Sequence, residues 1–318
     1  MPLGCRATNA QVPGKVGWMP RDHDWNCLGA RFARESEMTS LVVDWLRASG
    51  LEVRSEFVSP WGECDLVGAR LSPTRVAERL RLGQSRAVGS ITRAALLLDI
   101  PELGARRGTT VAHLVDIYAS SVTEPVVREE IGRLIADGFV VTSSRGRLAR
   151  VNGWFPLHER LVAVELKLSR VDDAIRQARS NLGFADESYI ALPIARAHRV
   201  AAAPRRRAEI ARMGIGVIGV TREGCELVMS ATPRKARTDK AIQLYCIEKF
   251  WRQRLRPAAT QRQFNISGST TASGRRAVPS SSSSGSPRPS AKAEERSWKR
   301  AIDRPGAGCA AIESNQRL

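Results

Sequence analysis

The sequence predicts an α/β fold in which a mixed central sheet is flanked by helices. Three patterns predict it: residues 36–50 repeat apolar side chains at helical spacing, residues 161–168 alternate between two faces as a strand does, and residues 215–220 form a short apolar run. The apolar fraction of the chain is high enough for a sizeable core, and its length allows two domains with additional tails.

The first expected helix spans residues 36–50, with Ser36 as its cap and Gly50 as its stop. Its apolar face carries Met38, Leu41, Val42, Trp45 and Leu46. Residues 51–58 are then expected to form the first strand of a hairpin that leads into Asp65.

A long insertion interrupts the hairpin that should join the strand of Asp65 to the strand of Glu165. A structureless loop of that length inside a compact domain is unusual, so the insertion must fold. Helices are expected at 90–100, 109–120 and 123–137, and a small hairpin at 139–151. Three helices followed by a two-stranded wing resemble a winged helix-turn-helix domain.

The rest of the predicted core follows residue 152. Helices are expected at 174–181, 205–213 and 238–255, and strands at 186–193, 215–220 and 225–229. The predicted organisation is a loosely ordered leader (1–30), a discontinuous core (31–70 and 152–255), the insert (71–151) and a disordered basic tail (256–318).

Two strand-like runs carry the strongest chemical signal. Side chains alternate between the faces of a strand, so Glu165 and Lys167 share one face while the other face of residues 161–168 is wholly apolar. Burying an isolated charge is costly, so this pair requires further polar groups or a metal ion. Asp65, in the run 61–68, supplies a second carboxylate.

These residues predict a divalent-metal phosphodiesterase centre. Mg²⁺ favours carboxylates together with water and phosphate oxygens, and Mn²⁺ can take its place. Asp65 and Glu165 are the expected ligands, with the carbonyl of Leu166 as a third. Lys167 is expected to orient the attacking water or to neutralise developing charge.

An Asp on one strand followed by Glu-x-Lys on the next resembles the PD-(D/E)XK superfamily of restriction endonuclease-like nucleases. The resemblance covers roughly residues 31–70 and 158–230, with helix, strands, Gln-bearing helix and strand in the family's order. It implies a restriction endonuclease-like sheet, and it implies that Glu37 and Gln177 approach the metal site. Two departures are Cys64, where many members carry proline, and the long insertion.

Charge composition favours a polyanionic partner. Lys and Arg number 50 against 32 Asp and Glu, a net charge of +18, although the excess of Arg over Lys is also typical of high-GC genomes. The expected nucleic-acid contacts are Arg145, Arg147 and Arg150 at the wing and Arg176, Arg179 and Arg205 to Arg207 beside the site. The third insert helix carries Glu124, Glu129 and Glu130 against two arginines, so a protein-contact or structural role for the insert stays open.

Other site classes are disfavoured. The six cysteines contain no Cys-x-x-Cys pair, so zinc is not expected, and Cys64 and Cys225 are interpreted as small core residues. Asp22-His23-Asp24 lies in the leader and His158 is expected to be an ordinary surface histidine. No apolar run approaches the length of a membrane span, which indicates a cytoplasmic protein.

The sequence therefore predicts a Mg²⁺-dependent DNA endonuclease, of restriction or mobile-element type, that acts on duplex DNA; many such nucleases act as homodimers to cut both strands. The alternative is a non-catalytic DNA-binding transcriptional regulator, in which the winged-helix insert is mounted on a nuclease-like scaffold.

Overall fold

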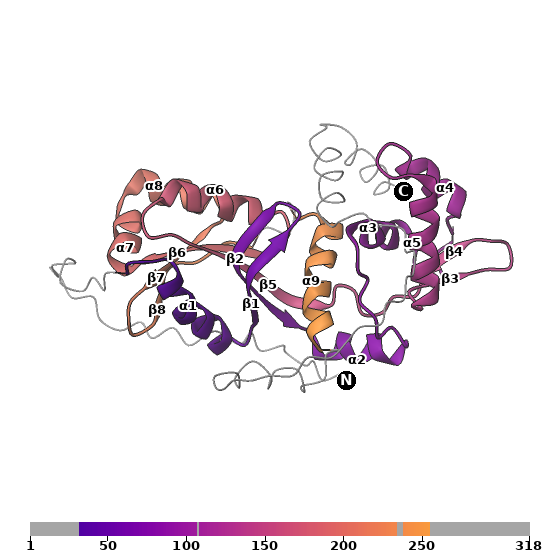
Figure 1. Cartoon of the computed structure of the whole chain (residues 1–318), viewed down its shortest axis with the longest axis horizontal. Coiled ribbons are helices and arrows are strands. Elements are labelled where there is room, and N and C mark those ends of the chain that lie inside the picture. Colours follow the sequence, from indigo (N-terminus) through magenta and orange to yellow (C-terminus); the bar gives the residue numbers. More distant parts are fainter. Residues whose placement is uncertain (1–31, 107, 234–237, 255–318) are drawn as a thin grey trace, which may run out of the picture.

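The computed structural model describes residues 32–106, 108–233 and 238–254 (Figure 1). A six-stranded mixed sheet has the order β1-β2-β5-β6-β7-β8, with β5, β6 and β7 parallel and the other neighbours antiparallel. The strands are β1 (Glu52–Ser59), β2 (Gly62–Leu71), β5 (His158–Leu166), β6 (Glu187–Pro193), β7 (Gly216–Val220) and β8 (Cys225–Met229). The predicted α/β class with a mixed sheet flanked by helices is confirmed.

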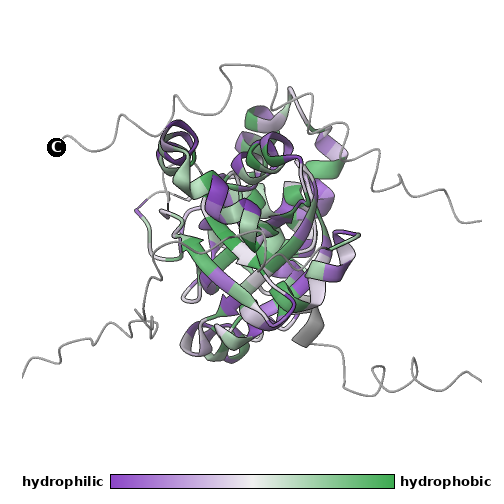
Figure 2. Cartoon of the chain, turned by 90° about the vertical axis from the view of Figure 1, so that its left-hand side faces the viewer, coloured by the Kyte–Doolittle hydropathy of each residue, from purple (hydrophilic) through white to green (hydrophobic). Residues whose placement is uncertain are grey.

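Helices cover both faces of this sheet. One face packs against α1 (Ser36–Ala48), and the other packs against α6 (Val171–Asn181), α7 (Ile194–Ala202), α8 (Pro204–Met213) and α9 (Lys240–Arg254). The predicted alternation of β5 is confirmed, because Val162 and Val164 pack on the α1 side while Leu161 and Ala163 pack on the α9 side. Figure 2 shows mainly hydrophobic strands inside helices that combine hydrophobic and hydrophilic residues.

Helix α1 matches its predicted span closely but begins differently. Met38, Val42 and Leu46 form its buried face. Ser36 lies inside the helix, and Glu35 occupies the N-cap position without a side-chain capping bond, so the predicted cap was wrong. Gly50 follows the helix at φ +76°, a conformation that favours glycine, as expected for the stop.

The insertion folds into helices and a hairpin between the paired ends of β2 and β5. It contains α3 (Ile91–Asp99), α4 (Val111–Tyr118), α5 (Glu124–Ala136), β3 (Val140–Thr142) and β4 (Leu148–Arg150) at the predicted places. It also contains α2 (Pro73–Arg81), which was not predicted. The insert shares one continuous hydrophobic cluster with α9 and the sheet.

A buried ion pair joins the insert to the rest of the molecule. Arg79 of α2 donates to both carboxylate oxygens of Glu248 on α9, at 2.5 and 3.0 Å, and both side chains are almost fully buried. The guanidinium also lies 4.6 Å from the ring centroid of Trp154 and 4.3 Å from that of Trp251. Removing one partner of such a pair typically costs about 3–5 kcal/mol, so this contact fixes the insert against α9.

Several expectations fall outside the described residues: the leader 1–30 with Asp22-His23-Asp24, and the tail 256–318. Among the helices that are described, none is long and apolar enough to cross a membrane.

Candidate active site

Asp65, Glu165 and Lys167 meet at the carboxyl end of β5. Leu66 of β2 pairs with Val164 of β5, so the next position on each strand places Asp65 opposite Glu165. Asp65 Oδ2 accepts a hydrogen bond from the backbone N of Leu166 at 2.7 Å and lies 3.5 Å from Lys167 Nζ. The register of the two strands therefore brings together three residues that are up to 102 positions apart in the chain.

Glu165 is the most deeply buried member, with 1% of its surface exposed. Its Oε1 accepts a hydrogen bond of 2.7 Å from Asn181 Nδ2, whereas its buried Oε2 accepts none of good geometry within the described part of the chain. The neighbouring thiol of Cys64 also interacts with this carboxylate and lowers its pKa. Burial raises the pKa of Glu165 to about 7; the negative charge of Asp65 also raises it, while the hydrogen bond from Asn181 lowers it. An unsatisfied buried carboxylate oxygen is costly unless it meets a proton or a cation.

Lys167 lies one residue beyond the end of β5, where its backbone N donates to Ala191 O at 3.1 Å. Its Nζ donates to Leu166 O at 2.9 Å and is 3.6 Å from Glu35 Oε2. Glu35 also accepts a hydrogen bond of 3.2 Å from the backbone N of Leu168. The ammonium is thus held between two carboxylates, on Asp65 and Glu35.

The glutamate that reaches the site from the first helix is Glu35, and the expectation for Glu37 was wrong. Glu37 instead forms an ion pair of 2.7 Å with Arg222. The sequence contained a signal for the difference. Glu35 precedes Met38 by three positions and Val42 by seven, so it extends the buried stripe of α1, and Glu37 does not.

The residue of α6 that bonds Glu165 is Asn181, which the sequence reasoning missed. Gln177 lies one turn earlier on the same side of the helix and is exposed, so the structure brings it near the site without a bond to the carboxylates. Asn181 was detectable as a polar residue at the spacing of the buried Ala174 and Ala178.

Cys64 is buried beside this centre, as expected for a small core residue. Its Sγ accepts a hydrogen bond of 3.3 Å from Asn181 Nδ2, so Asn181 bridges Cys64 and Glu165. Burial and the nearby charge of Glu165 raise the pKa of the thiol. The thiol is therefore protonated and unreactive at neutral pH.

The donors at this centre fit a hard divalent cation. Among the described residues no group of three or more His, Cys, Asp and Glu side chains forms a metal site, so a Mg²⁺-type ion would be held by two carboxylates, Asp65 and Glu165, and by water. The buried, unbonded Oε2 of Glu165 is the observation that supports the fit. The carbonyl of Leu166, expected as a third ligand, accepts Lys167 Nζ in this structure.

The predicted nucleic-acid contacts at the wing differ in their accessibility. Arg145 is exposed, and Arg147 is exposed and donates to Gly108 O at 3.2 Å. Arg150 donates to Leu97 O at 3.1 Å and Leu98 O at 3.2 Å, and 15% of its side chain is exposed. Arg150 is therefore less accessible to nucleic acid than Arg145 and Arg147, because β4 directs its guanidinium onto the end of α3.

The predicted contacts on α6 are exposed. Arg176 pairs with Asp173 of the same helix, and Arg179 is exposed one turn from the end of α6. In the following helix pair, Arg205 and Arg207 are exposed and Arg206 pairs with Asp172 at 2.7 Å.

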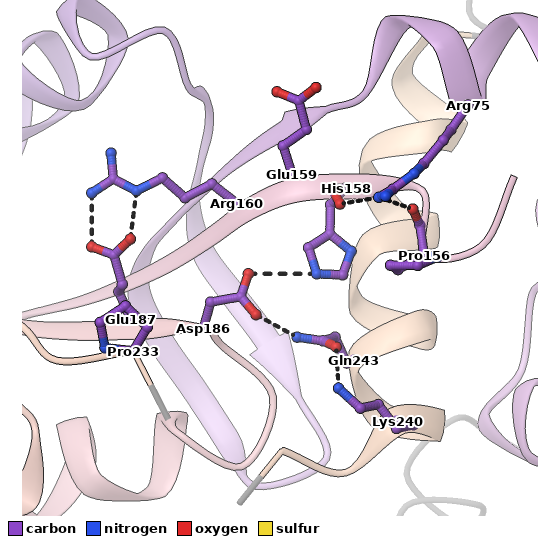
Figure 3. A pocket seen from close by; sticks show the side chains of 10 residues that line it. All are labelled: Arg75, Pro156, His158, Glu159, Arg160, Asp186, Glu187, Pro233, Lys240 and Gln243. Carbon is purple, nitrogen blue, oxygen red and sulfur yellow. Dashed lines mark hydrogen bonds and ion pairs between the residues drawn. The ribbon is translucent and has the colours of Figure 1, made fainter. Parts of the chain in front are cut away.

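A second polar centre lies at the opposite, amino end of β5, in a pocket of about 520 Å³ (Figure 3). His158 Nε2 is 3.5 Å from Asp186 Oδ2, and Gln243 of α9 donates to Asp186 Oδ1 at 3.0 Å. His158 is 7% exposed, so the expectation of a surface histidine was wrong. Hydrogen bonds from His158, Leu161 and Gln243 lower the pKa of Asp186 against the opposing effect of burial.

Comparison with known proteins leaves the family open. No family model and no curated protein matches the chain. A protein of unknown function from Silicibacter pomeroyi, SPO1766, is a similar solved structure, at 15% identity and a TM-score of 0.35 over 74% of this chain and 97% of that chain. A likeness of this degree carries no argument about fold family or function, so the inference of function depends on the geometry of the site.

Proposed function

We propose that this chain is a divalent-metal-dependent DNA endonuclease of the PD-(D/E)XK type, which hydrolyses phosphodiester bonds with Asp65, Glu165 and Lys167. The observation that carries the proposal is that Asp65 lies opposite Glu165 in the register of β2 and β5, with Lys167 Nζ 3.5 Å from Asp65 Oδ2 and with one buried oxygen of Glu165 unbonded among the described residues. Buried polar groups are normally bonded, and a carboxylate oxygen without a hydrogen bond, beside a second carboxylate, is a suitable ligand for a cation.

Each residue has a defined task in this proposal. Asp65 and Glu165 would hold Mg²⁺ or Mn²⁺, and the ion, when bound, polarises the phosphodiester and lowers the pKa of a bound water. Lys167 Nζ, 3.5 Å from Asp65 Oδ2, is placed to orient the water or to offset charge that develops on the phosphate. Glu35 positions the ammonium, and Asn181 holds Glu165.

The order of elements supports the family assignment. A helix precedes an antiparallel pair, Asp65 lies on the second strand of that pair, Glu165 lies on the next strand of the sheet, and a helix and a parallel strand follow. Within the insert, the order of α3, α4, α5 and the β3–β4 hairpin supports a winged-helix relationship, with α2 as an additional helix. Duplex DNA in the cytoplasm is the proposed substrate, since the net charge of +18 favours a polyanion, and a homodimer would permit cleavage of both strands.

Cleavage assays test the proposal directly. Full-length protein is incubated with supercoiled plasmid, linear duplex and single-stranded DNA, with Mg²⁺, Mn²⁺ or chelator, beside Asp65→Ala and Lys167→Ala. We expect metal-dependent nicking that both substitutions abolish. Equal behaviour of wild type and variants, or no effect of metal, would refute the catalytic role.

A second candidate function is a non-catalytic DNA-binding regulator that uses the insert. The succession of α3, α4, α5 and the β3–β4 hairpin in the insert favours it. Binding of duplex DNA that Arg145→Ala plus Arg147→Ala weakens, without cleavage under any metal condition, would favour this function over the nuclease.

A further inference from the structure

We propose that Arg196, Arg199 and Arg207, here called the arginine track, hold the phosphate backbone of duplex DNA beside the candidate active site. The proposal rests on the proposed nuclease function, because that function requires the bound DNA to run toward the candidate active site. The track lies on α7 and α8, away from the insert (Figure 1).

The track begins at the site. Helix α7 starts at Ile194, directly after β6, so its first turn is at the same edge of the sheet as the carboxyl end of β5. Arg196 NH1 donates to Ser169 O at 3.3 Å, and Ser169 follows Lys167 by two residues. A charged guanidinium therefore lies against the segment that carries the proposed catalytic ammonium.

The track continues along α7 to α8. Arg199 is three residues beyond Arg196, so the two side chains are neighbours on the helix surface, with Cβ atoms roughly 5–6 Å apart. Arg199 and Arg207 together line a groove of about 550 Å³ between α7, α8 and β8. The three guanidinium groups thus form a row that leads away from the site.

The charges of this row are available for a ligand. Within the described ranges, none of the three arginines forms an ion pair with a carboxylate; Arg196 and Arg199 donate to the backbone carbonyls of Ser169 and Ala195. Together α7 and α8 carry six arginines and one glutamate. Guanidinium groups are suited to phosphate oxygens, which they bind through paired N–H donors.

Helix α5 of the insert offers a weaker surface for phosphate than α7 and α8. Helix α5 carries three glutamates and two arginines, and its arginines pair with Glu124 and Glu129 on the same helix. The insert also lies at the other end of the long axis from α7 and α8 (Figure 1). Charge complementarity therefore favours the arginine track as the path of the DNA.

The test measures binding of a fluorescent duplex of mixed sequence to the full-length protein in chelator, so that no cleavage is involved. We expect the triple variant R196A/R199A/R207A to bind roughly tenfold to a hundredfold more weakly and to lose about 2–3 from the slope of log affinity against log salt, since each phosphate contact contributes about 0.9. The charge-retaining variant R196K/R199K/R207K is expected to recover most of the slope.

Two further variants separate a track from a general charge effect. Arg47→Ala removes the same charge from the far end of α1, where Arg47 is exposed and pairs weakly with Asp44, and it should leave the slope unchanged. Glu226→Gln removes a carboxylate from the groove itself and should strengthen binding about twofold.

A triple variant that keeps the wild-type slope would overturn the arginine track. The same holds if Arg47→Ala lowers the slope by one third of the triple variant's loss, because any single arginine would then have the same effect. If the triple variant loses slope but the wild type shows no metal-dependent cleavage, the arginine track is supported and the nuclease function is refuted. If the wild type cleaves DNA but the triple variant keeps the wild-type slope, the nuclease function is supported and the arginine track is refuted.

Discussion

The two ends of β5 lie beside carboxylates in opposite circumstances: Glu165 is buried and Asp186 is partly buried. At the carboxyl end, Glu165 has one bonded oxygen and one oxygen with no hydrogen bond from the described residues, and its pKa is raised to about 7. At the amino end, Asp186 accepts hydrogen bonds from the backbone N of Leu161 and from Gln243, lies beside His158, and has a lowered pKa.

The difference indicates that the carboxylate of Asp186 stabilises the fold, whereas the carboxylate of Glu165 does not. Asp186 ties β5, β6 and α9 together, and its negative charge is stabilised by the groups around it. Glu165 is held in place by Asn181 but is not neutralised. Sites that bind charged ligands commonly retain a buried ionisable group that is not fully compensated, and such a group lowers the stability of the fold.

The largest expected effect is on cleavage by Glu165→Gln. We expect the nicking rate to fall at least about 10³-fold, equivalent to roughly 4 kcal/mol, because a ligand of the proposed ion is lost. The thermal midpoint should stay the same or rise, because an uncompensated buried carboxylate is removed. A clearly lower midpoint would show that Glu165 stabilises the fold and would break the comparison.

The matching change at the other end is Asp186→Ala, which should give the opposite result. It leaves the backbone N of Leu161, Gln243 and His158 without their acceptor, so the free energy of unfolding should fall by about 2–4 kcal/mol. The nicking rate of the folded fraction should remain within about threefold. Denaturant unfolding and nicking measured on the same preparation check both outcomes.

Strand alternation explains why the central trio was predictable. The faces of residues 161–168 follow from a period of two, and a carboxylate on a core strand has few roles besides a charged site. Asp65 was expected to supply a second carboxylate that converges with Glu165, and the register of β2 and β5 places the two opposite each other.

The differences at Glu37 and Arg150 have a common physical cause, because each depends on where a side chain finds its partner. Glu37 and Glu35 differ by two helix positions, and the tertiary contact of each decides which one reaches Lys167. Arg150 and Arg147 belong to the same cluster of arginines in the sequence of the wing, yet Arg150 donates hydrogen bonds to the carbonyls of Leu97 and Leu98. Helix α2 was overlooked although Ser72 and Pro73 are a typical helix start.

A smaller effect is expected from pH, and the two carboxylates predict opposite signs. The folded pKa of Glu165 lies above its unfolded value of 4.5, so its contribution to stability is present at low pH and declines as pH rises to about 7. The folded pKa of Asp186 lies below its unfolded value of 3.8, so its contribution is lost as pH falls below that value. Unfolding of wild type, Glu165→Gln and Asp186→Ala from pH 3 to 8 measures each contribution by difference.

The same titration should govern metal binding. A metal ion and a proton compete for Glu165, so Mn²⁺ affinity is expected to fall about tenfold for each pH unit below 7 and to level off above it. Calorimetric titration of the full-length protein with Mn²⁺ checks this slope. A flat profile between pH 5.5 and 7 would mean that Glu165 is not a ligand.

The smallest expected effect concerns Asn181, whose hydrogen bond lowers the pKa of Glu165. Asn181→Ala should move the midpoint of the Mn²⁺ binding profile to higher pH and weaken binding at pH 7 about threefold, because a larger fraction of Glu165 is then protonated. Above the new midpoint the affinity should return to that of wild type. Gln177→Ala, one turn away and exposed, is the matched control and should leave the profile in place. If Asn181→Ala weakens binding equally at every pH, Asn181 acts on the shape of the site and not on the ionisation of Glu165, because a change in ionisation disappears once the carboxylate is fully charged.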